Sequence, residues 1–359
     1  MLNPLTTYLA EKAPAGKHLT AANEGNAVAL AAGHYLSTGK IGLVYMQNSG
    51  LGNALNPLLS LTDPLVYKIP LLMLIGWRGE PGVKDEPQHL KQGQLTLPLL
   101  ENLGIKFAIL PDSNEKALRI LNDAKLYMQE TNEPFALVVR KGAFSSYKVK
   151  SNDAEAYPLA REAALEIVLS ELEDKDVVLS TTGKLSREIF EYRVRNGSGH
   201  QQDFLNVGSM GHVSQIALAV SLNVKKQRVY CFDGDGSAIM HMGAFAINAQ
   251  YGGANFKHLL FNNGAHESVG GQPTVGHKID FCKIVDGCGY KLVLRANSES
   301  ELNAAFHELK NAVGPAFLEV RVKTGSRDNL GRPTKSPLEN KSEFMNYLTR
   351  QRANNKWRK

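Results

Sequence analysis

Apolar, β-branched runs alternate with helical patterns along the whole chain. Strand-like runs occupy residues 41–46, 70–77, 105–110 and 135–140, and then 176–182, 228–233, 258–263, 290–295 and 316–322. Helical spacing of apolar residues occupies residues 24–38, 114–129, 159–173, 213–222, 237–251 and 300–312. Continuous apolar strands separated by helices are typical of parallel sheets that helices cover on both faces. The pattern therefore predicts an α/β protein.

One stretch interrupts this alternation. The sequence SSYKVKSNDAEAYP, residues 145–158, is polar and has neither helical nor strand periodicity, so we interpret 147–158 as a linker. The linker separates two predicted α/β domains of similar size, 1–146 and 159–359.

The beginning of the chain departs from the usual order of such domains. Leu2, Leu5 and Leu9 have helical spacing, whereas an α/β domain normally opens with a strand. We therefore expect that the first strand of the N-terminal domain is missing from this sequence.

Composition and charge narrow the class of protein. The chain has 359 residues, of which 43% are hydrophobic, and this share excludes wholesale disorder. Lys and Arg number 41 against 35 Asp and Glu, a mild excess that fits a solvated surface or the attraction of small anions. Binding to nucleic acid needs a concentrated basic face, and only the tail NNKWRK comes close, so we expect no nucleic-acid partner.

The cysteines and the apolar runs bear on location. Cys231, Cys282 and Cys288 form neither a CxxC pair nor a disulfide framework, which favours a reducing, cytoplasmic compartment. No apolar run approaches 18 residues and no secretory signal opens the sequence, so we expect no membrane span and no export.

The stretch FDGDGSAIMHMG, residues 232–243, is the most informative chemical motif. It lies between a predicted strand and a predicted helix, where glycines allow close approach to a ligand and the helix N-terminus attracts phosphate. Asp235 would repel a phosphate unless a divalent cation bridged the two. Asn262 and Asn263 end the next strand, and parallel strands end at one edge of a sheet. Asp235 and one of these asparagines can therefore share a Mg²⁺ ion.

The spacing extends the motif. With 25 residues between Gly236 and Asn262, the strand, GDG, helix and NN order resembles the cofactor motif of the thiamine diphosphate-dependent decarboxylases. The resemblance implies that Asp235, Asn263 and the carbonyl of Ala265 bind Mg²⁺, with Asn262 as a substitute for Asn263. It also implies that VGSMGH, 207–212, carries the residue that bends the cofactor, Met210. The implied cofactor-binding residues of this domain are Thr181, Thr182, Gly183, Ser209, Met210, Gly234, Gly236, Ser237 and Asn263.

The N-terminal domain matches the other half of such a site. A Glu in the first turn of a helix stabilises the helix dipole, and by itself Glu24 in AANEGNAVALAAG has that interpretation. The resemblance implies instead that Glu24 is catalytic and binds the aminopyrimidine of the cofactor. Asn48, Ser49 and Gly50, in YMQNSGLGNALNPL, correspond to the loop that shapes the aminopyrimidine pocket. The family pairs the two domain types across subunits, so we expect a homodimer or higher homo-oligomer with active sites at the interface.

Four longer stretches make the resemblance more specific. AANEGNAVALAAG, YMQNSGLGNALNPL, LIGWRGEPGVKDEPQH and FNNGAHESVGGQPT together resemble the phosphonopyruvate decarboxylases, with the sulfopyruvate decarboxylases close by, over essentially the whole chain. That family usually begins with a strand and a loop like PDS, and this sequence starts after them. The resemblance implies conversion of 3-phosphonopyruvate to phosphonoacetaldehyde and CO₂ with thiamine diphosphate and Mg²⁺, in phosphonate metabolism.

The substrate would be a small anionic 2-keto acid, whose dianionic tail needs cationic or N–H donors. Arg78, Lys84 and His89 are candidates from a loop after a strand, and His266 and Glu267 are candidates for moving protons or orienting substrate. Arg327 and Arg332 are weaker candidates from a C-terminal loop. Two alternatives stay open: a sulfopyruvate or other 2-keto acid decarboxylase, and a cofactor-binding subunit that is inactive without a partner or the missing N-terminus.

Overall fold

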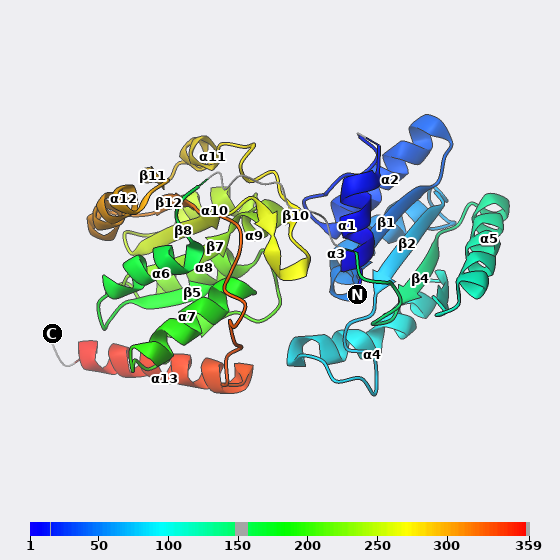
Figure 1. Cartoon of the computed structure of the whole chain (residues 1–359). Coiled ribbons are helices and arrows are strands. Elements are labelled where there is room, and N and C mark those ends of the chain that lie inside the picture. The colour runs from blue at the N-terminus through cyan, green and yellow to red at the C-terminus, as the bar shows by residue number, and fades with distance from the viewer. Residues whose placement is uncertain (15, 148–156, 357–359) are drawn as a thin grey trace. The chain divides into compact units, whose positions relative to one another are not determined.

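The chain folds into two compact α/β units, Met1–Lys150 and Ser151–Lys359 (Figure 1). The computed structural model describes residues 1–14, 16–147 and 157–356. Most of the predicted linker, 148–156, lies outside the described residues. Within the described part of the chain, no helix is long and apolar enough to cross a membrane.

The first unit contains one parallel sheet with the strand order β1-β2-β4-β3. Its helices and strands are α1 (Asn3–Lys12), α2 (Glu24–Thr38), β1 (Gly42–Gln47), η1 (Asn48–Gly50), α3 (Leu51–Pro57), η2 (Leu58–Thr62), β2 (Leu71–Gly76), α4 (Pro87–Asn102), β3 (Lys106–Ile109), α5 (Asn114–Thr131) and β4 (Phe135–Val139). The chain opens with α1, as the spacing of its leucines indicated, and β1 lies at one edge of the sheet.

Helices cover both faces of this sheet because successive strand side chains point to opposite sides. Met73 and Val138 belong to a core formed with α2, α3 and α4. Leu74 and Leu137, their chain neighbours, belong to a second core formed with α1 and α5. The predicted parallel sheet with helices on both faces is confirmed for this unit (Figure 1).

The second unit contains a six-stranded sheet, ordered β11-β12-β8-β7-β5-β6, in which every pairing is parallel. Its helices and strands are α6 (Arg161–Ser170), β5 (Val177–Ser180), α7 (Lys184–Arg195), β6 (Asp203–Leu205), α8 (Val213–Asn223), β7 (Val229–Gly234), α9 (Asp235–Met240), α10 (Ala244–Tyr251), β8 (Phe256–Asn262), β9 (Ala265–His266), η3 (Glu267–Val269), β10 (Gln272–Pro273), α11 (Phe281–Cys288), β11 (Leu292–Ala296), α12 (Glu299–Asn311), β12 (Ala316–Arg321) and α13 (Pro337–Lys356).

Strand β7 shows how this sheet separates two cores. Tyr230 and Phe232 pack with α6, α7 and α12, whereas Val229 and Cys231 pack on the opposite face with α8, α10, α11 and α13. Because both faces of the central strands are buried, these strands are mostly apolar, which is why the sequence pattern found them; Lys257 and His258 in β8 and Glu319 in β12 are buried exceptions.

Several details differ from the sequence-based expectations, and α7, α11 and α13 also lie outside the predicted helical ranges. The predicted helix 237–251 is two helices, α9 and α10, because the backbone leaves the helical conformation at His241 before Gly243. Helices α3 and α4 were not predicted, since Pro57 and Pro98 lie inside them and proline normally ends a helix. His89 therefore lies on the first turn of α4 and not in a loop.

Candidate active site

Four loops meet at the carboxyl edge of the sheet in the second unit. They follow β6, β5, β7 and β8, which are adjacent and parallel, so their ends lie together. The Thr181 hydroxyl donates to Ser237 Oγ over 3.0 Å, and Ser237 Oγ accepts from the Gly211 N–H over 3.1 Å. The Gly208 N–H donates to Thr182 Oγ1 over 3.1 Å. The structure thus brings the predicted cofactor loops into one cluster.

Two helices begin in this cluster without a capping side chain. Gly183 precedes α7 and Gly234 precedes α9, and neither has a side chain that could accept from the first N–H groups. Asn23 caps α2 and Ser298 caps α12, whereas α4, α6 and α8 also begin without a capping side chain. Uncapped N–H groups and the positive end of the helix dipole favour a bound anion such as a diphosphate.

Gly183 also has a conformation that excludes most other residues. Its φ angle is +110°, in the region that L-amino acids rarely adopt, and an added Cβ would lie 2.5 Å from Ser268 Oγ. The turn after β5 therefore depends on glycine, which keeps its backbone open to a ligand.

Asp235 is buried in the first turn of α9 with a carboxylate that contacts two neighbouring segments. Its side chain is 2% exposed, and Oδ2 accepts a hydrogen bond from the Thr274 hydroxyl. Oδ1 accepts from the Asn263 N–H over 3.4 Å. Burial raises the pKa of Asp235 to about 6, although both hydrogen bonds oppose the shift. A divalent cation would favour the charged form that burial disfavours.

The two asparagines after β8 have different surroundings. The Asn262 amide donates to the Gly276 carbonyl over 2.9 Å and to Glu319 Oε1 over 2.8 Å, so it links three parts of the unit. Asn263 Oδ1 accepts from the N–H of Ala265 over 3.1 Å, a contact within its own turn. This difference favours Asn263 as the metal ligand and gives Asn262 a structural role.

His266, Gly236 and Met210 converge beside the metal-binding turn. A Cβ added to Gly236 would lie 2.6 Å from His266 Cε1 and 3.4 Å from Met210 Cε. His266 is on β9, so its imidazole covers the glycine of the GDG turn. The structure therefore brings this predicted catalytic residue next to the predicted cofactor residues.

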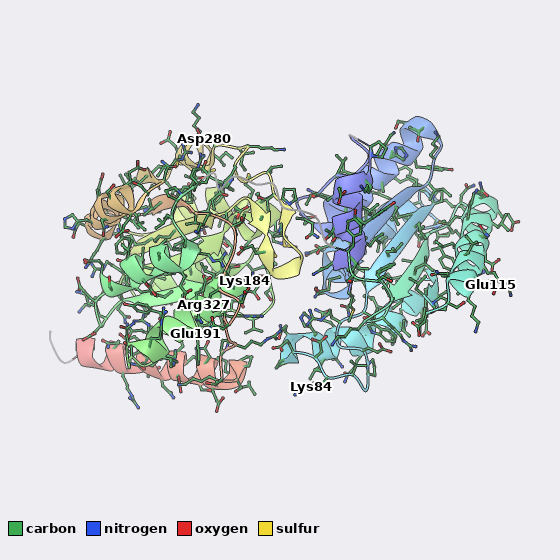
Figure 2. The ribbon with its side chains drawn as sticks, in the orientation of Figure 1. Lys84, Glu115, Lys184, Glu191, Asp280 and Arg327 are labelled. Carbon is green, nitrogen blue, oxygen red and sulfur yellow. The ribbon has the colours of Figure 1, made fainter. Side chains whose placement is uncertain are left out.

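Glu267 and Arg327 are bound to other charged side chains. Arg161, with a side chain 7% exposed, pairs with Glu267 and also with Glu188 at 2.8 Å. Burial alone would raise the pKa of Glu267, but the Arg161 charge lowers it overall. Arg327 lies against Glu191 on α7 (Figure 2). These ion pairs occupy both side chains, and the contact of either residue with substrate stays a prediction.

In the first unit, the predicted catalytic Glu24 begins α2. The Asn53 amide donates to Glu24 Oε2 over 2.9 Å, which fixes the direction of the carboxylate. Gly50 borders the same carboxylate, because a Cβ added there would lie 2.5 Å from Glu24 Cδ. Gly50 was predicted from the sequence and Asn53 was not, although both lie in the stretch YMQNSGLGNALNPL.

Asn48 contacts the loop after β2, whereas Ser49 contacts the end of β1. The Asn48 amide donates to the Arg78 carbonyl over 2.8 Å and to Thr96 Oγ1 over 2.9 Å, and its oxygen accepts from the Arg78 N–H over 3.1 Å. Ser49 Oγ accepts from the Gln47 amide over 3.0 Å. These contacts hold the end of β1 to the end of β2.

Arg78 forms a two-point ion pair with Asp85. Arg78 Nε lies 2.8 Å from Asp85 Oδ2, and Nη2 lies 2.5 Å from Oδ1. These bonds hold the pKa of Asp85 well below its usual range. The pair is close to electrically neutral, so Arg78 offers less charge to a substrate than the sequence alone suggested. Lys84, in the same loop, is exposed (Figure 2).

The residues present fit thiamine diphosphate and Mg²⁺. The uncapped helix starts at Gly183 and Gly234 suit the diphosphate. The buried carboxylate of Asp235 and the amide oxygen of Asn263 are the oxygen ligands that Mg²⁺ prefers.

Comparison with known proteins agrees with this assignment. Residues 2–98 match the thiamine pyrophosphate enzyme, N-terminal TPP binding domain, and residues 181–320 match the thiamine pyrophosphate enzyme, C-terminal TPP binding domain. Phosphonopyruvate decarboxylase from Streptomyces viridochromogenes is 34% identical over 351 residues, 94% of this chain and 86% of that protein.

Two further relatives extend the comparison. Phosphonopyruvate decarboxylase from Streptomyces hygroscopicus is also 34% identical, over 93% of this chain and 85% of that protein. Sulfopyruvate decarboxylase from Methanosarcina acetivorans is 28% identical over 90% of this chain and 86% of that protein. The expected thiamine diphosphate-binding domains are confirmed, and the chain belongs to the phosphonopyruvate decarboxylase family of thiamine pyrophosphate enzymes.

Proposed function

We propose that this protein decarboxylates 3-phosphonopyruvate to phosphonoacetaldehyde and CO₂, using thiamine diphosphate and Mg²⁺. The observation that carries the substrate assignment is the 34% identity, along 94% of the chain, to a phosphonopyruvate decarboxylase. The sulfopyruvate decarboxylase relative is less similar, at 28% identity. A place in phosphonate metabolism, in the cytoplasm, follows from this assignment.

The second unit would hold the diphosphate and the metal. Asp235, Asn263 and the carbonyl of Ala265 would bind Mg²⁺, and the N–H groups around Gly183 and Gly236 would bind the diphosphate. The support is the hydrogen-bonded cluster at this sheet edge and the burial of Asp235. Thr181 and Ser237 would shape the cluster from within, since their hydroxyls are bonded to each other.

When bound, thiamine diphosphate supplies the nucleophilic carbon and the electron sink for decarboxylation. Glu24 would hold a proton between its carboxylate and the aminopyrimidine nitrogen, and Asn53 would keep that carboxylate in place. His266 would face the reacting region from above Gly236 and transfer a proton at its imidazole. Arg78 would reach the phosphonate through Nη1, because Nε and Nη2 already bind Asp85.

The assembly would be a homodimer or a higher homo-oligomer. Glu24 and Asp235 belong to different units of the chain, Met1–Lys150 and Ser151–Lys359. Members of this family combine the two kinds of unit from different subunits, so Glu24 of one subunit would face the metal site of another.

The test is aldehyde release from 3-phosphonopyruvate with and without thiamine diphosphate and Mg²⁺, beside sulfopyruvate and pyruvate as substrates. We expect cofactor-dependent turnover with the highest kcat/KM for phosphonopyruvate. A higher kcat/KM for sulfopyruvate would replace the substrate in the proposal. Cofactor binding without turnover of any of the three acids would contradict the proposed activity and favour a subunit that needs a partner.

A further inference from the structure

A short two-stranded ribbon brings a threonine back onto the metal-binding turn. In this ribbon β9 pairs antiparallel with β10, His266 opposite Gln272 and Ala265 opposite Pro273. Directly after β10, the Thr274 N–H donates to the Gly264 carbonyl over 2.8 Å. Thr274 therefore lies beside the asparagine turn although ten residues lie between it and Asn263 along the chain.

The Thr274 side chain is buried and bonded on both sides. Its exposure is 9%, and its hydroxyl oxygen accepts from the Gly276 N–H over 3.0 Å. A hydroxyl has a single proton, and the Asp235 carboxylate can only accept at neutral pH, so that proton points to Asp235 Oδ2. The acceptor-only carboxylate thus sets the direction of the Thr274–Asp235 hydrogen bond, while the Gly276 N–H holds the hydroxyl oxygen from the other side.

Gly276 closes the same corner of the site. A Cβ added to it would lie 2.6 Å from Asp235 Oδ2, 2.6 Å from Asn262 Oδ1 and 2.9 Å from Thr274 Oγ1. Three oxygens therefore crowd this glycine, and the Asp235 carboxylate has little freedom to rotate toward it. With Oδ2 held in this corner, Oδ1 is the oxygen that lies on the side of Asn263.

We infer that Thr274 is a positioning residue that orients the Asp235 carboxylate for Mg²⁺. The inference rests on the proposed function, because it takes Asp235 as a metal ligand. Hydrogen bonds to a metal-binding carboxylate fix its direction, and losing one typically costs 10- to 100-fold in metal affinity. Thr274 ends the stretch FNNGAHESVGGQPT, but its residue type and position in the sequence indicate no role.

The experiment measures the Mg²⁺ concentration that gives half-maximal retention of thiamine diphosphate on the full-length protein. Thr274→Val and Thr274→Ala remove the hydroxyl by two different side chains, and Thr274→Ser restores it. Thr62→Val is the matched control, because Thr62 is also buried and its hydroxyl donates to the Leu58 carbonyl in the first unit. Melting temperatures without metal report on folding.

We expect Thr274→Val and Thr274→Ala to raise the half-maximal Mg²⁺ concentration by about 10- to 100-fold. Thr274→Ser and Thr62→Val should stay within about threefold of the wild type, and saturating Mg²⁺ should restore cofactor retention to all variants. An unchanged Mg²⁺ requirement in either hydroxyl-free variant that melts like the wild type would overturn the inference, as would a Thr274→Ser protein that behaves like Thr274→Val. A wild-type protein without Mg²⁺-dependent retention would contradict the proposed function itself.

Discussion

The carboxylate of Glu24 fills the space that a side chain at position 50 would need. A Cβ on Gly50 would lie 2.5 Å from Glu24 Cδ, well inside van der Waals contact. The glycine that ends η1, after β1, thus determines where the acid at the start of α2 can point, and two segments distant in sequence define one functional position.

Replacing Gly50 should therefore impair turnover more than binding. Gly50→Ala pushes the Glu24 carboxylate away, and misplacing a catalytic group by about 1 Å can cost about 10²-fold in rate. We expect kcat to fall by about this factor while thiamine diphosphate is still bound. Gly52→Ala is the control, since a Cβ there meets nothing within 4 Å. Equal kcat values for the two variants would contradict the contact as a determinant of activity.

The charge of Glu24 can be tested without changing its shape. Glu24→Gln keeps an oxygen for the hydrogen bond from Asn53 but cannot exchange a proton with the aminopyrimidine. Loss of general acid–base catalysis predicts a fall in kcat of about 10²- to 10⁴-fold. Steady-state kinetics measure the fall in kcat, and a cofactor titration shows whether the variant still binds thiamine diphosphate. Near-normal turnover in this variant would remove Glu24 from the mechanism.

The adjacent asparagines should behave differently when each is replaced by alanine. Asn263→Ala should weaken Mg²⁺-dependent cofactor retention, as Asp235→Ala should, without lowering the melting temperature of the metal-free protein. Asn262→Ala removes the donor to the Gly276 carbonyl and one of the donors to Glu319, which should cost about 1–3 kcal/mol of stability. Thermal melts and cofactor-retention assays on all three variants test this difference. Loss of retention in Asn262→Ala together with loss of stability in Asn263→Ala would exchange the roles of Asn262 and Asn263.

The buried Lys257 should make the stability of the fold depend on pH. Its side chain is buried in β8, its ammonium donates to the Ala312 carbonyl over 2.5 Å, and burial lowers its pKa to about 8 from 10.5. Between these two values the unfolded chain binds more protons than the folded protein, so stability should rise with pH there.

Removing the lysine should remove that dependence. Relative to Lys257→Met, the wild type should gain on the order of 2–3 kcal/mol as the pH rises from 8 to 10.5. Melting temperatures of both proteins across this range provide the measurement, with Lys291→Met as an exposed control. A constant difference between wild type and Lys257→Met would show that the buried amine does not titrate in this window.

Asn340 should stabilise the edge strand β6 of the larger sheet. Its amide donates to the Asp203 carbonyl over 2.8 Å, and its oxygen accepts from the Leu205 N–H over 3.0 Å. The side chain thereby replaces a neighbouring strand along β6, whose backbone groups would otherwise lack partners.

Asn340→Ala should cost about 1–3 kcal/mol and speed hydrogen exchange at Leu205. Asn303→Ala removes an exposed side-chain contact on α12 and should change the melting temperature little. Similar melting temperatures for Asn340→Ala and Asn303→Ala would contradict the edge-strand role.

Much of the architecture could be predicted from the sequence because it depends on short-range patterns. The runs at 70–77 and 228–233 became β2 and β7, and the predicted helix 24–38 became α2. Buried strands must be apolar and surface helices must be amphipathic, so neighbouring residues carry this information. Helices α3 and α4 escaped prediction because Pro57 and Pro98 oppose the local preference, and packing against the sheet outweighs them.

In the candidate site, too, some residues could be predicted from the sequence and others could not. The GDG motif, the asparagine pair and Glu24 could be found in the sequence because each is a short motif whose residue types suit one chemistry. The sequence could not separate Asn262 from Asn263, nor show that Arg78 is paired, because the partners Glu319 and Asp85 become known only when the chain has folded. Contacts that loop closure creates, such as Asn53 with Glu24 and Thr274 with Asp235, leave no local pattern, so only the tertiary structure decides them.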